Sequence, residues 1–142
     1  MYSIIPVISG RTIPRWDPAK RLAQEERWRK ISREAAKQCG RADIPIIGAI
    51  SDIKEIINNS SDYDKRFIAI LSDETICLKE ALEGFDGGKI AIAIGPEGDF
   101  TPDEAGLAKL AGFKPVSLGP RVLKSDTAGL ASLAILNYVF SN

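Results

Sequence analysis

The sequence predicts an α/β domain with a mainly parallel sheet and flanking helices. Apolar, β-branched runs at residues 66–71 and 89–94 are typical of strands that are buried on both faces. Helical patterns alternate with such runs along the chain, which is the order found in parallel sheets. The length of 142 residues and the hydrophobic content of 44% suffice for one domain with a real core.

The first third of the chain contains shorter strand patterns and a polar loop. Apolar runs predict strands at residues 4–8 and 44–50, and Pro6 in the first of them is typical of an edge strand or a strand start. Residues 9–18 form a loop with basic side chains. Ser51 is expected to cap a short helix that ends near residue 58.

A long helix is predicted over residues 19–39, and Gly40 is expected to end it. One face of this helix is expected to be apolar, with Trp28, Ile31, Ala35 and Cys39. The opposite face is expected to be basic, with Arg29, Lys30, Arg33 and Lys37. A charged helix face is most often a solvated surface. A phosphate-contacting surface is the alternative, which the surplus of basic residues in this part of the chain favours.

The rest of the chain alternates strands and helices. The expected strands cover residues 66–71, 89–94 and 115–118, and the expected helices cover residues 75–84, 101–111 and 125–140. The helix at residues 75–84 is expected to be short. The last helix is apolar nearly all round. We therefore expect it to be buried, in part at a subunit interface.

The strand at residues 89–94 runs directly into a glycine turn at residues 95–98, with the sequence GPEG. Thr101 and Glu104 then form the signature of a capping box, with Pro102 at the first helical position. A strand, a tight turn and a helix in this order build ligand crevices at the carboxyl ends of open α/β sheets. A plain connection without a ligand is the alternative.

Charge is balanced over the whole chain but not along it. Residues 1–45 carry 10 basic and 5 acidic side chains, whereas residues 46–142 carry 9 and 14. Such an asymmetry indicates a surface for a polyanion in the first part. The chain has no histidine, which excludes histidine as a general base or zinc ligand, and Cys39 and Cys77 are isolated. We expect a cytoplasmic protein without a metal and without a membrane-spanning segment.

A second loop resembles the first. Residues 117–128, with the sequence SLGPRVLKSDTA, follow a short apolar strand with a Gly-Pro step and precede a helix. Two such loops side by side present many backbone N–H and C=O groups to a small ligand. Because the first loop is rich in acidic side chains, a ligand that is neutral or cationic at that end fits better than a phosphate.

These motifs resemble those of a known family. The sequence IGPEGDFTPDE, the later SLGPRVLKSDTA and the upstream ERWRKISREAAKQCGRADIP are together similar to the SPOUT superfamily of knotted methyltransferases. More narrowly, they resemble the family that methylates N3 of a uridine in bacterial 16S ribosomal RNA. The resemblance covers the chain from about Pro6.

The resemblance implies a deep trefoil knot in the C-terminal part of the sheet, S-adenosylmethionine as the cofactor, and a homodimer. We expect one methyltransferase domain over residues 1–142. The N-terminal RNA-binding barrel that family members carry is missing from this sequence, a departure from the family that leaves open either an excised domain or a minimal chain. The cofactor-binding positions that it implies are Leu71, Ile94, Gly95, Pro96, Glu97, Gly98, Leu118, Gly119, Arg121 and Leu123.

For catalysis, the resemblance points to Arg121 and Lys124 as cations near the uracil carbonyls. N3 of uridine is a poor nucleophile while it is protonated, so a nearby cation would stabilise the negative charge that develops. The family generally has Arg and Glu where this chain has Lys124 and Asp126. Lysine keeps the charge but loses the planar fork, and Asp126 is expected only to cap the last helix.

The expected RNA-binding residues are basic or amide side chains of the first part of the chain. They are Arg11, Arg15, Arg29, Lys30, Arg33, Lys37, Gln38 and Arg41. The expected substrate is 16S ribosomal RNA, free or within the small subunit. Two alternatives remain at this point: another RNA methylation on the same fold, at a ribose 2′-oxygen or another base, and a non-catalytic domain that binds RNA or a small ligand.

Overall fold

The computed structural model describes residues 3–140. Their contacts divide into two compact units. Unit 1 comprises residues 3–8 and 12–52, and unit 2 comprises Ser9–Arg11 and residues 53–140. The single methyltransferase domain over the whole chain stays a prediction.

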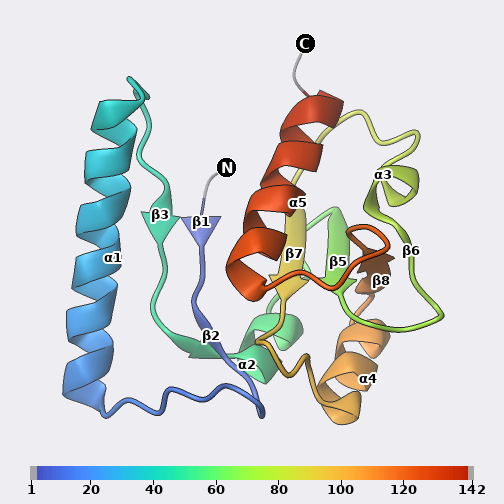
Figure 1. The fold of residues 1–142 in the computed structure, drawn as a ribbon, viewed down its shortest axis with the longest axis horizontal. Helices are drawn as coiled ribbons and strands as arrows, with labels where there is room; N and C mark the ends of the chain where they lie inside the picture. The colour runs from blue at the N-terminus through green and yellow to red at the C-terminus, as the bar shows by residue number, and fades with distance from the viewer. Residues whose placement is uncertain (1–2, 141–142) are drawn as a thin grey trace. The chain divides into compact units, whose positions relative to one another are not determined.

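Unit 1 is built on the long helix α1, Pro18–Gln38. It begins where the sequence predicts, because Asp17 caps it by accepting a hydrogen bond from the Lys20 amide at 2.9 Å and Pro18 occupies the first turn. Cys39 is the C-cap, and Gly40 follows in the left-handed conformation. Helix α1 packs along strand β3, Ile46–Ile47 (Figure 1).

The packed face of α1 is not the predicted one. Ile31 is 54% exposed, and Ala35 and Cys39 are also exposed, whereas Glu25 and Ala36 are buried. The segment opposite the helix explains this difference, because it presents backbone groups that need partners. Their partners are polar side chains of α1. Glu25 accepts from the Ile50 amide, Arg29 donates to the Ile47 carbonyl, and Ser32 donates to the Pro45 carbonyl.

Two short parallel ladders complete unit 1. Strand β1, Ser3–Ile4, pairs with β3, and strand β2, Val7–Ile8, pairs with β4, Ser51–Asp52. The single strand predicted at residues 4–8 is therefore interrupted, since Pro6 has no N–H to donate to a ladder. The strand predicted at residues 44–50 is likewise shorter. Ser51 does not cap a helix as predicted, because it belongs to β4.

Unit 2 contains a four-stranded sheet in which all pairs are parallel, in the order β6-β8-β5-β7. The strands are β5 Lys65–Ala69, β6 Ile76–Cys77, β7 Ile90–Ile94 and β8 Lys114–Ser117. Strands β5 and β7 pair along their full length. The predicted parallel α/β architecture is confirmed, and β5, β7 and β8 lie where the sequence predicts strands.

The helices of unit 2 are α2 Ile53–Asn58, α3 Leu78–Ala81, α4 Pro102–Leu110 and α5 Ser125–Phe140. Helix α3 contacts α5, and α2 contacts α4. The short helix predicted within residues 75–84 is present only at Leu78–Ala81. Ile76 and Cys77 instead form an edge strand against β8, and only one helical turn follows.

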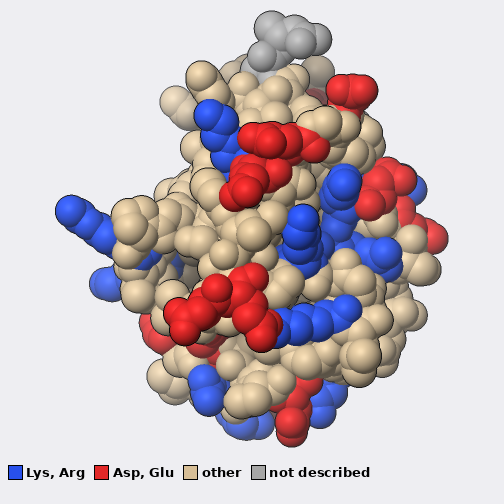
Figure 2. All heavy atoms as spheres, turned by 90° about the vertical axis from the view of Figure 1, so that its right-hand side faces the viewer, with Lys and Arg blue, Asp and Glu red and all other residues tan. Residues whose placement is uncertain are grey.

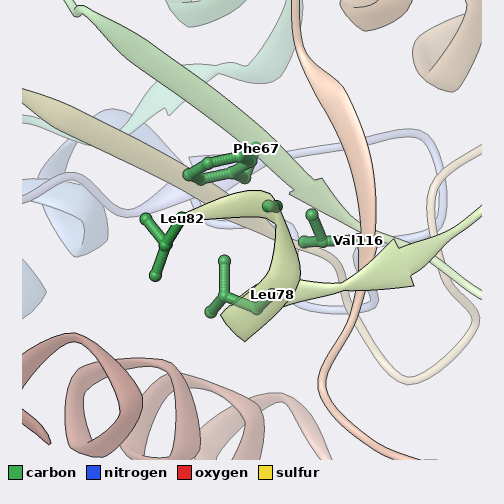
Figure 3. Packing of buried hydrophobic residues seen from close by; sticks show 5 residues of the cluster. Phe67, Leu78, Leu82 and Val116 are labelled. Carbon is green, nitrogen blue, oxygen red and sulfur yellow. The ribbon is translucent and has the colours of Figure 1, made fainter. Parts of the chain in front are cut away.

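The core of unit 2 explains that short helix. Phe67 from β5, Val116 from β8 and Leu78 and Leu82 from α3 and its C-cap point toward one another (Figure 3). Each of these side chains is at most 2% exposed. Burying them stabilises the fold by roughly 2 kcal/mol each. The packing therefore outweighs the helical preference of the surrounding sequence.

Helix α5 is less buried than its apolar sequence suggests. It contacts β7 and α3, and Figure 1 shows it in front of β7. Only Ala128 and Ser132 of this helix are buried, whereas Leu130 is 71% and Tyr138 83% exposed. The chain thus buries one side of the helix, and burial of the other side at a subunit interface stays a prediction. Leu130, Ala134 and Tyr138 form an outward stripe at helical spacing, here called the α5 stripe.

Candidate active site

A cleft opens at the carboxyl ends of β5, β7 and β8. Its lining comes from the segments that follow these strands and from the first turn of α5. The lining residues are Ala69, Ile70, Leu71, Ile94, Gly95, Pro96, Glu97, Asp99, Val116, Ser117, Leu118, Gly119, Arg121, Val122, Leu123, Ser125 and Ala128. This position is where open α/β sheets bind small ligands.

Asp99 joins two of the segments that form the cleft. One oxygen of its carboxylate accepts a hydrogen bond from the Leu71 amide at 3.0 Å, and the other accepts from the Phe100 amide at 2.7 Å. Asp99 has a φ of 63°, in the left-handed region that aspartate tolerates better than most residues. Its amide also closes a turn onto the Pro96 carbonyl at 2.8 Å. Asp99 therefore fixes the turn after β7 relative to the end of β5.

Ser125, the first residue of α5, joins the segment after β8 to the end of β7. Its hydroxyl donates to the Gly95 carbonyl at 2.6 Å, which ties the start of α5 to the end of β7. The ring of Phe100 is buried beneath this turn, and a Cβ at Gly95 would lie 3.2 Å from it. The backbone around the cleft is thus held by packing and by hydrogen bonds.

The predicted capping box of α4 is present and has a further partner. The Thr101 hydroxyl accepts from the Glu104 amide at 3.2 Å, and Glu104 Oε2 accepts from the Thr101 amide at 2.9 Å. Glu104 is 3% exposed, and its other oxygen accepts from the Gly10 amide at 2.7 Å. Next to Gly10, Arg11 Nη1 donates to the Gly98 carbonyl at 2.6 Å. Segment Ser9–Arg11 therefore lies against the turn after β7.

Nine of the ten predicted cofactor-binding residues line the cleft, and Gly98 does not. Gly98 faces Arg11 instead, whose Cδ would lie 3.3 Å from a Cβ at this position. Of the two predicted catalytic residues, Arg121 lines the cleft, whereas Lys124 is exposed and outside the lining. Asp126 lies in the first turn of α5 and accepts a hydrogen bond from the Thr127 amide at 2.7 Å.

The sequence-based prediction missed Asp99 and Ser125. Both lie inside the motifs that carry the family resemblance, but their contacts join segments far apart in the chain. A signal for Asp99 was present, since an aspartate directly after a Gly-rich turn is a common turn residue. No local signal indicates that Ser125 reaches Gly95, because that hydrogen bond depends on the sheet order.

The charge around the cleft is mixed. Exposed Glu97 and half-buried Asp99 come from the turn after β7, and exposed Arg121 comes from the segment after β8. Among residues 3–140, no cluster of His, Cys, Asp or Glu side chains could hold a metal ion. Over the same residues, no helix is both long and apolar enough to cross a membrane.

The predicted RNA-binding residues fall into two groups in the structure. Arg29 is engaged with Glu25 and the Ile47 carbonyl, and Arg11 with the turn after β7. The others have exposed side chains, namely Arg15, Lys30, Arg33, Lys37, Gln38 and Arg41. Two of these form surface ion pairs, Lys37 with Glu34 and Arg41 with Asp43. The hydrogen bond from Arg41 holds the pKa of Asp43 below its ordinary value.

A different charge pattern appears on the side of the molecule that carries β6, β8, α3 and α4. Figure 2 shows this side, where Lys and Arg side chains lie directly beside Asp and Glu side chains. Lys109 and Glu74 form an ion pair here, and their hydrogen bond lowers the pKa of Glu74. A surface with both signs interspersed does not favour a polyanion.

The parallel sheet and the cleft at the strand ends define an α/β domain with a cleft in the position where such folds bind small ligands. The family to which this domain belongs follows from sequence comparison. A model described as an RNA methyltransferase domain matches residues 1–137, and the chain belongs to that family. The resemblance drawn from the three motifs is thereby confirmed.

Named relatives agree with this assignment. The chain is 29% identical to a ribosomal RNA small subunit methyltransferase E from Bacillus subtilis, over 96% of this chain and 56% of the relative. A protein of the same name from Buchnera aphidicola is 32% identical, over 82% of this chain and 45% of the relative. The chain spans about half the length of the curated relatives it matches.

Solved structures are also similar. A ribosomal RNA small subunit methyltransferase E from Neisseria gonorrhoeae, bound to S-adenosyl methionine, matches with a TM-score of 0.85 and 30% identity, over 98% of this chain and 55% of the other. A structure from Legionella pneumophila in complex with the cofactor SAM matches with a TM-score of 0.90 and 28% identity, over 98% and 56% of the two chains.

Proposed function

We propose that this chain is an S-adenosylmethionine-dependent RNA methyltransferase that modifies N3 of a uridine in 16S ribosomal RNA. The observation that carries the proposal is the cleft at the ends of β5, β7 and β8. It is lined by nine of the ten residues that the family motifs assign to the cofactor. The membership in an RNA methyltransferase family and the names of the relatives support the choice of substrate.

The residues of the cleft fit the proposed cofactor. Apolar side chains such as Ile94, Leu118 and Leu123 suit the faces of an adenine ring. Gly119 has a φ of 134°, and no atom lies within 4 Å of the place where its Cβ would be, so the backbone there leaves a cradle open. Carboxylates of Glu97 and Asp99 suit a cationic sulfonium. When bound, S-adenosylmethionine supplies an electrophilic methyl group.

The chain's own contribution is to position the uridine and to favour loss of its N3 proton. Arg121 lines the cleft and is the cation best placed to stabilise negative charge on the uracil carbonyls. Lys124 lies three residues further along, exposed, and is proposed to assist from outside the cleft. Holding the two reactants in line contributes several kcal/mol to catalysis.

RNA is proposed to dock on unit 1, through the exposed basic residues of α1 and its flanking loops. Phosphate contacts of this kind position a substrate without reading its sequence. The mixed charge on the face in Figure 2 supports the choice, because that face does not offer a continuous positive surface. The small subunit and a cytoplasmic location are parts of the same proposal.

A homodimer and a C-terminal knot complete the proposal. The α5 stripe supports the dimer, since large apolar side chains such as Leu130 and Tyr138 are exposed on one helix face. The sheet order supports the knot. Strand β8 lies between β6 and β5, which both precede it in sequence, so the C-terminal part of the chain inserts between two earlier segments.

The test is to incubate the chain and methyl-labelled S-adenosylmethionine with 16S ribosomal RNA and with small subunits from cells that lack the modification. Digestion to nucleosides and mass spectrometry identify the product. We expect 3-methyluridine. A ribose 2′-O-methyl or another methylated base would show that the fold carries a different reaction. Binding of S-adenosylmethionine without methylation of any RNA would contradict the proposed function.

A further inference from the structure

Segment Ser9–Arg11 supports the turn after β7 from outside the cleft. By its contacts this segment belongs to unit 2, although the residues before and after it belong to unit 1. Ser9 is buried, the Gly10 amide donates to Glu104, and Arg11 reaches the turn directly. Ser9, Gly10 and Arg11 thus hold the outer side of the turn that carries residues 95–97, and they are here called the clasp.

The hydrogen bonds of Arg11 come from one nitrogen of its guanidinium. Its Nη1 donates to the Gly98 carbonyl at 2.6 Å and to the Phe100 carbonyl at 3.4 Å. Its aliphatic stem lies against Gly98, because a Cβ there would be 3.3 Å from Arg11 Cδ and 3.5 Å from Arg11 Cβ. Hydrogen bonds from a charged donor are among the stronger ones in proteins. The two carbonyls that Arg11 binds flank Asp99, whose side chain holds the end of β5.

Glu104 fixes the other end of the clasp. It is 3% exposed, and it accepts hydrogen bonds from Thr101 and Gly10 with different oxygens. The same carboxylate therefore starts helix α4 and anchors the clasp. A Cβ at Gly10 would lie 3.0 Å from the Thr101 side chain, so the clasp approaches α4 closely.

We propose that Arg11 is a positioning residue for the cofactor turn and acts on S-adenosylmethionine binding rather than on RNA. It is not among the residues that line the cleft, and it works through the carbonyls of Gly98 and Phe100. Without it, the turn at residues 95–99 keeps its links to Leu71 and Ser125 but loses its outer support. This inference rests on the proposed function, since it assumes that the cleft binds S-adenosylmethionine.

The test compares Arg11→Ala with Arg15→Ala, a nearby exposed arginine of the same charge that belongs to unit 1. Calorimetry with S-adenosylmethionine and no RNA measures the dissociation constant. We expect Arg11→Ala to raise it about tenfold, the effect of removing one charge-assisted hydrogen bond, and Arg15→Ala to leave it unchanged. Arg11→Lys, which keeps a charged donor on a differently shaped side chain, should fall between Arg11→Ala and the wild type.

Two further measurements separate positioning from a general loss of stability. Amide exchange at residues 98–100 should become faster in Arg11→Ala, while exchange in β5 stays at the wild-type rate. If Arg11→Ala does not fold, Gly98→Val displaces the Arg11 stem from the other side. It should weaken S-adenosylmethionine binding, and the variant with both Gly98→Val and Arg11→Lys should be no weaker than the worse single variant.

Unchanged S-adenosylmethionine affinity in a folded Arg11→Ala variant overturns the inference. Reduced RNA affinity in both arginine variants, with unchanged S-adenosylmethionine affinity, would assign Arg11 to RNA instead. Failure of the wild type to bind S-adenosylmethionine would contradict the proposed function, and this outcome is distinct because it does not depend on any variant.

Discussion

Glu25 is a buried carboxylate that connects helix α1 to the strand segment of unit 1. The hydrogen bond from the Ile50 amide at 2.7 Å, with help from Arg29, lowers the pKa of Glu25 below its ordinary value of 4.5. A carboxylate with a lowered pKa stabilises the folded state above its ordinary pKa. That contribution disappears as the pH falls through the folded-state value.

We therefore expect Glu25→Gln to be less stable than the wild type at pH 7, and the difference to shrink as the pH falls below about 4.5, the ordinary glutamate value. Urea unfolding at a series of pH values measures this difference. Asp43 and Glu74 also have lowered pKa values, so only the difference between the two proteins reports on Glu25. A difference that is constant from pH 7 to pH 3 would contradict this assignment.

Gly119 lines the cleft and has a backbone conformation that favours glycine. Its φ of 134° disfavours any side chain, and its Cβ position is open. We expect Gly119→Val to lower the unfolding free energy by about 1–3 kcal/mol and to abolish binding of S-adenosylmethionine. Calorimetry and chemical denaturation measure the two effects.

Gly106 provides the matched control for Gly119. It lies within α4, and nothing lies within 4 Å of a Cβ placed there. Gly106→Ala should raise the unfolding free energy by about 0.5–1 kcal/mol and leave S-adenosylmethionine affinity unchanged. Equal affinity of the wild type and a folded Gly119→Val variant would move the cofactor site elsewhere.

Residue-level prediction succeeded where a motif is local. The capping box of Thr101 and Glu104 was predictable because both of its hydrogen bonds lie within one turn. The bond from Gly10 to Glu104 was not predictable, since it joins residues 94 positions apart. The same limit applies to the hydrogen bond from Arg11 to the Gly98 carbonyl, which joins residues 87 positions apart, while the role of Gly98 in cofactor binding stays a prediction.

At the scale of elements, the α5 stripe is exposed in the single chain although its large side chains are apolar. Leu130 and Tyr138 are more than two thirds exposed in a helix whose other face packs on β7 and α3. If the stripe is the proposed dimer interface, the wild type should have twice the mass of 15.4 kDa in solution. Leu130→Lys should shift it to the monomer, because an unpaired charge at an apolar interface is costly.

Light scattering at micromolar concentration measures this shift. Leu110→Lys serves as the control, because Leu110 is 89% exposed at the end of α4 and lies outside the stripe. It should leave the mass unchanged. A monomeric wild type would contradict the dimer, and a dimeric Leu130→Lys variant would place the interface elsewhere.

The exposed face of α1 is the element proposed to meet RNA. Lys30 and Arg33 are exposed on it, outside the packed face of Glu25, Arg29 and Ala36. Removing one side chain that binds a phosphate should reduce the salt slope of RNA binding by roughly 0.7–0.9. We expect the double variant Lys30→Ala, Arg33→Ala to bind RNA more weakly, with a flatter salt dependence.

The control for this prediction is Lys114→Ala, in strand β8 of the unit 2 sheet. It should leave the salt slope and RNA affinity unchanged. S-adenosylmethionine affinity should be the same in all of these proteins. If the double variant binds RNA like the wild type across the salt series, the charged face of α1 is only a solvated surface.

The existence of α1 was predictable, but its orientation was not. Asp17 and Gly40 mark its ends in the sequence, whereas the buried face depends on the backbone groups of residues 45–50. Hydrophobic periodicity selects apolar side chains for the interior, and here polar side chains were needed there instead. The helix expected within residues 75–84 covers only Leu78–Ala81, because Ile76 and Cys77 pair with β8, a contact that depends on the order of the sheet.

At the scale of the whole molecule, the fold class and the position of the cleft were predictable from the sequence. Alternating strands and helices predict a parallel sheet, and turns after two strands predict a site at their carboxyl ends. The order of the strands was not predictable, since nothing in β8 itself indicates that it lies between β5 and β6. That order brings the three segments of the cleft together.

The place of β8 in the sheet also determines when the fold can be completed. Strands β5 and β7 can pair as soon as both have been synthesised, but β6 has no neighbour until β8 arrives. During synthesis, the apolar side chains of β5 and α3 can therefore complete their core only after residues 114–117 have been made. These residues follow most of the chain. Such late, long-range pairing slows folding and leaves apolar surface exposed meanwhile. Until residues 114–117 have left the ribosome, β6 lacks its partner in this sheet and the edge of β5 that β8 covers stays open.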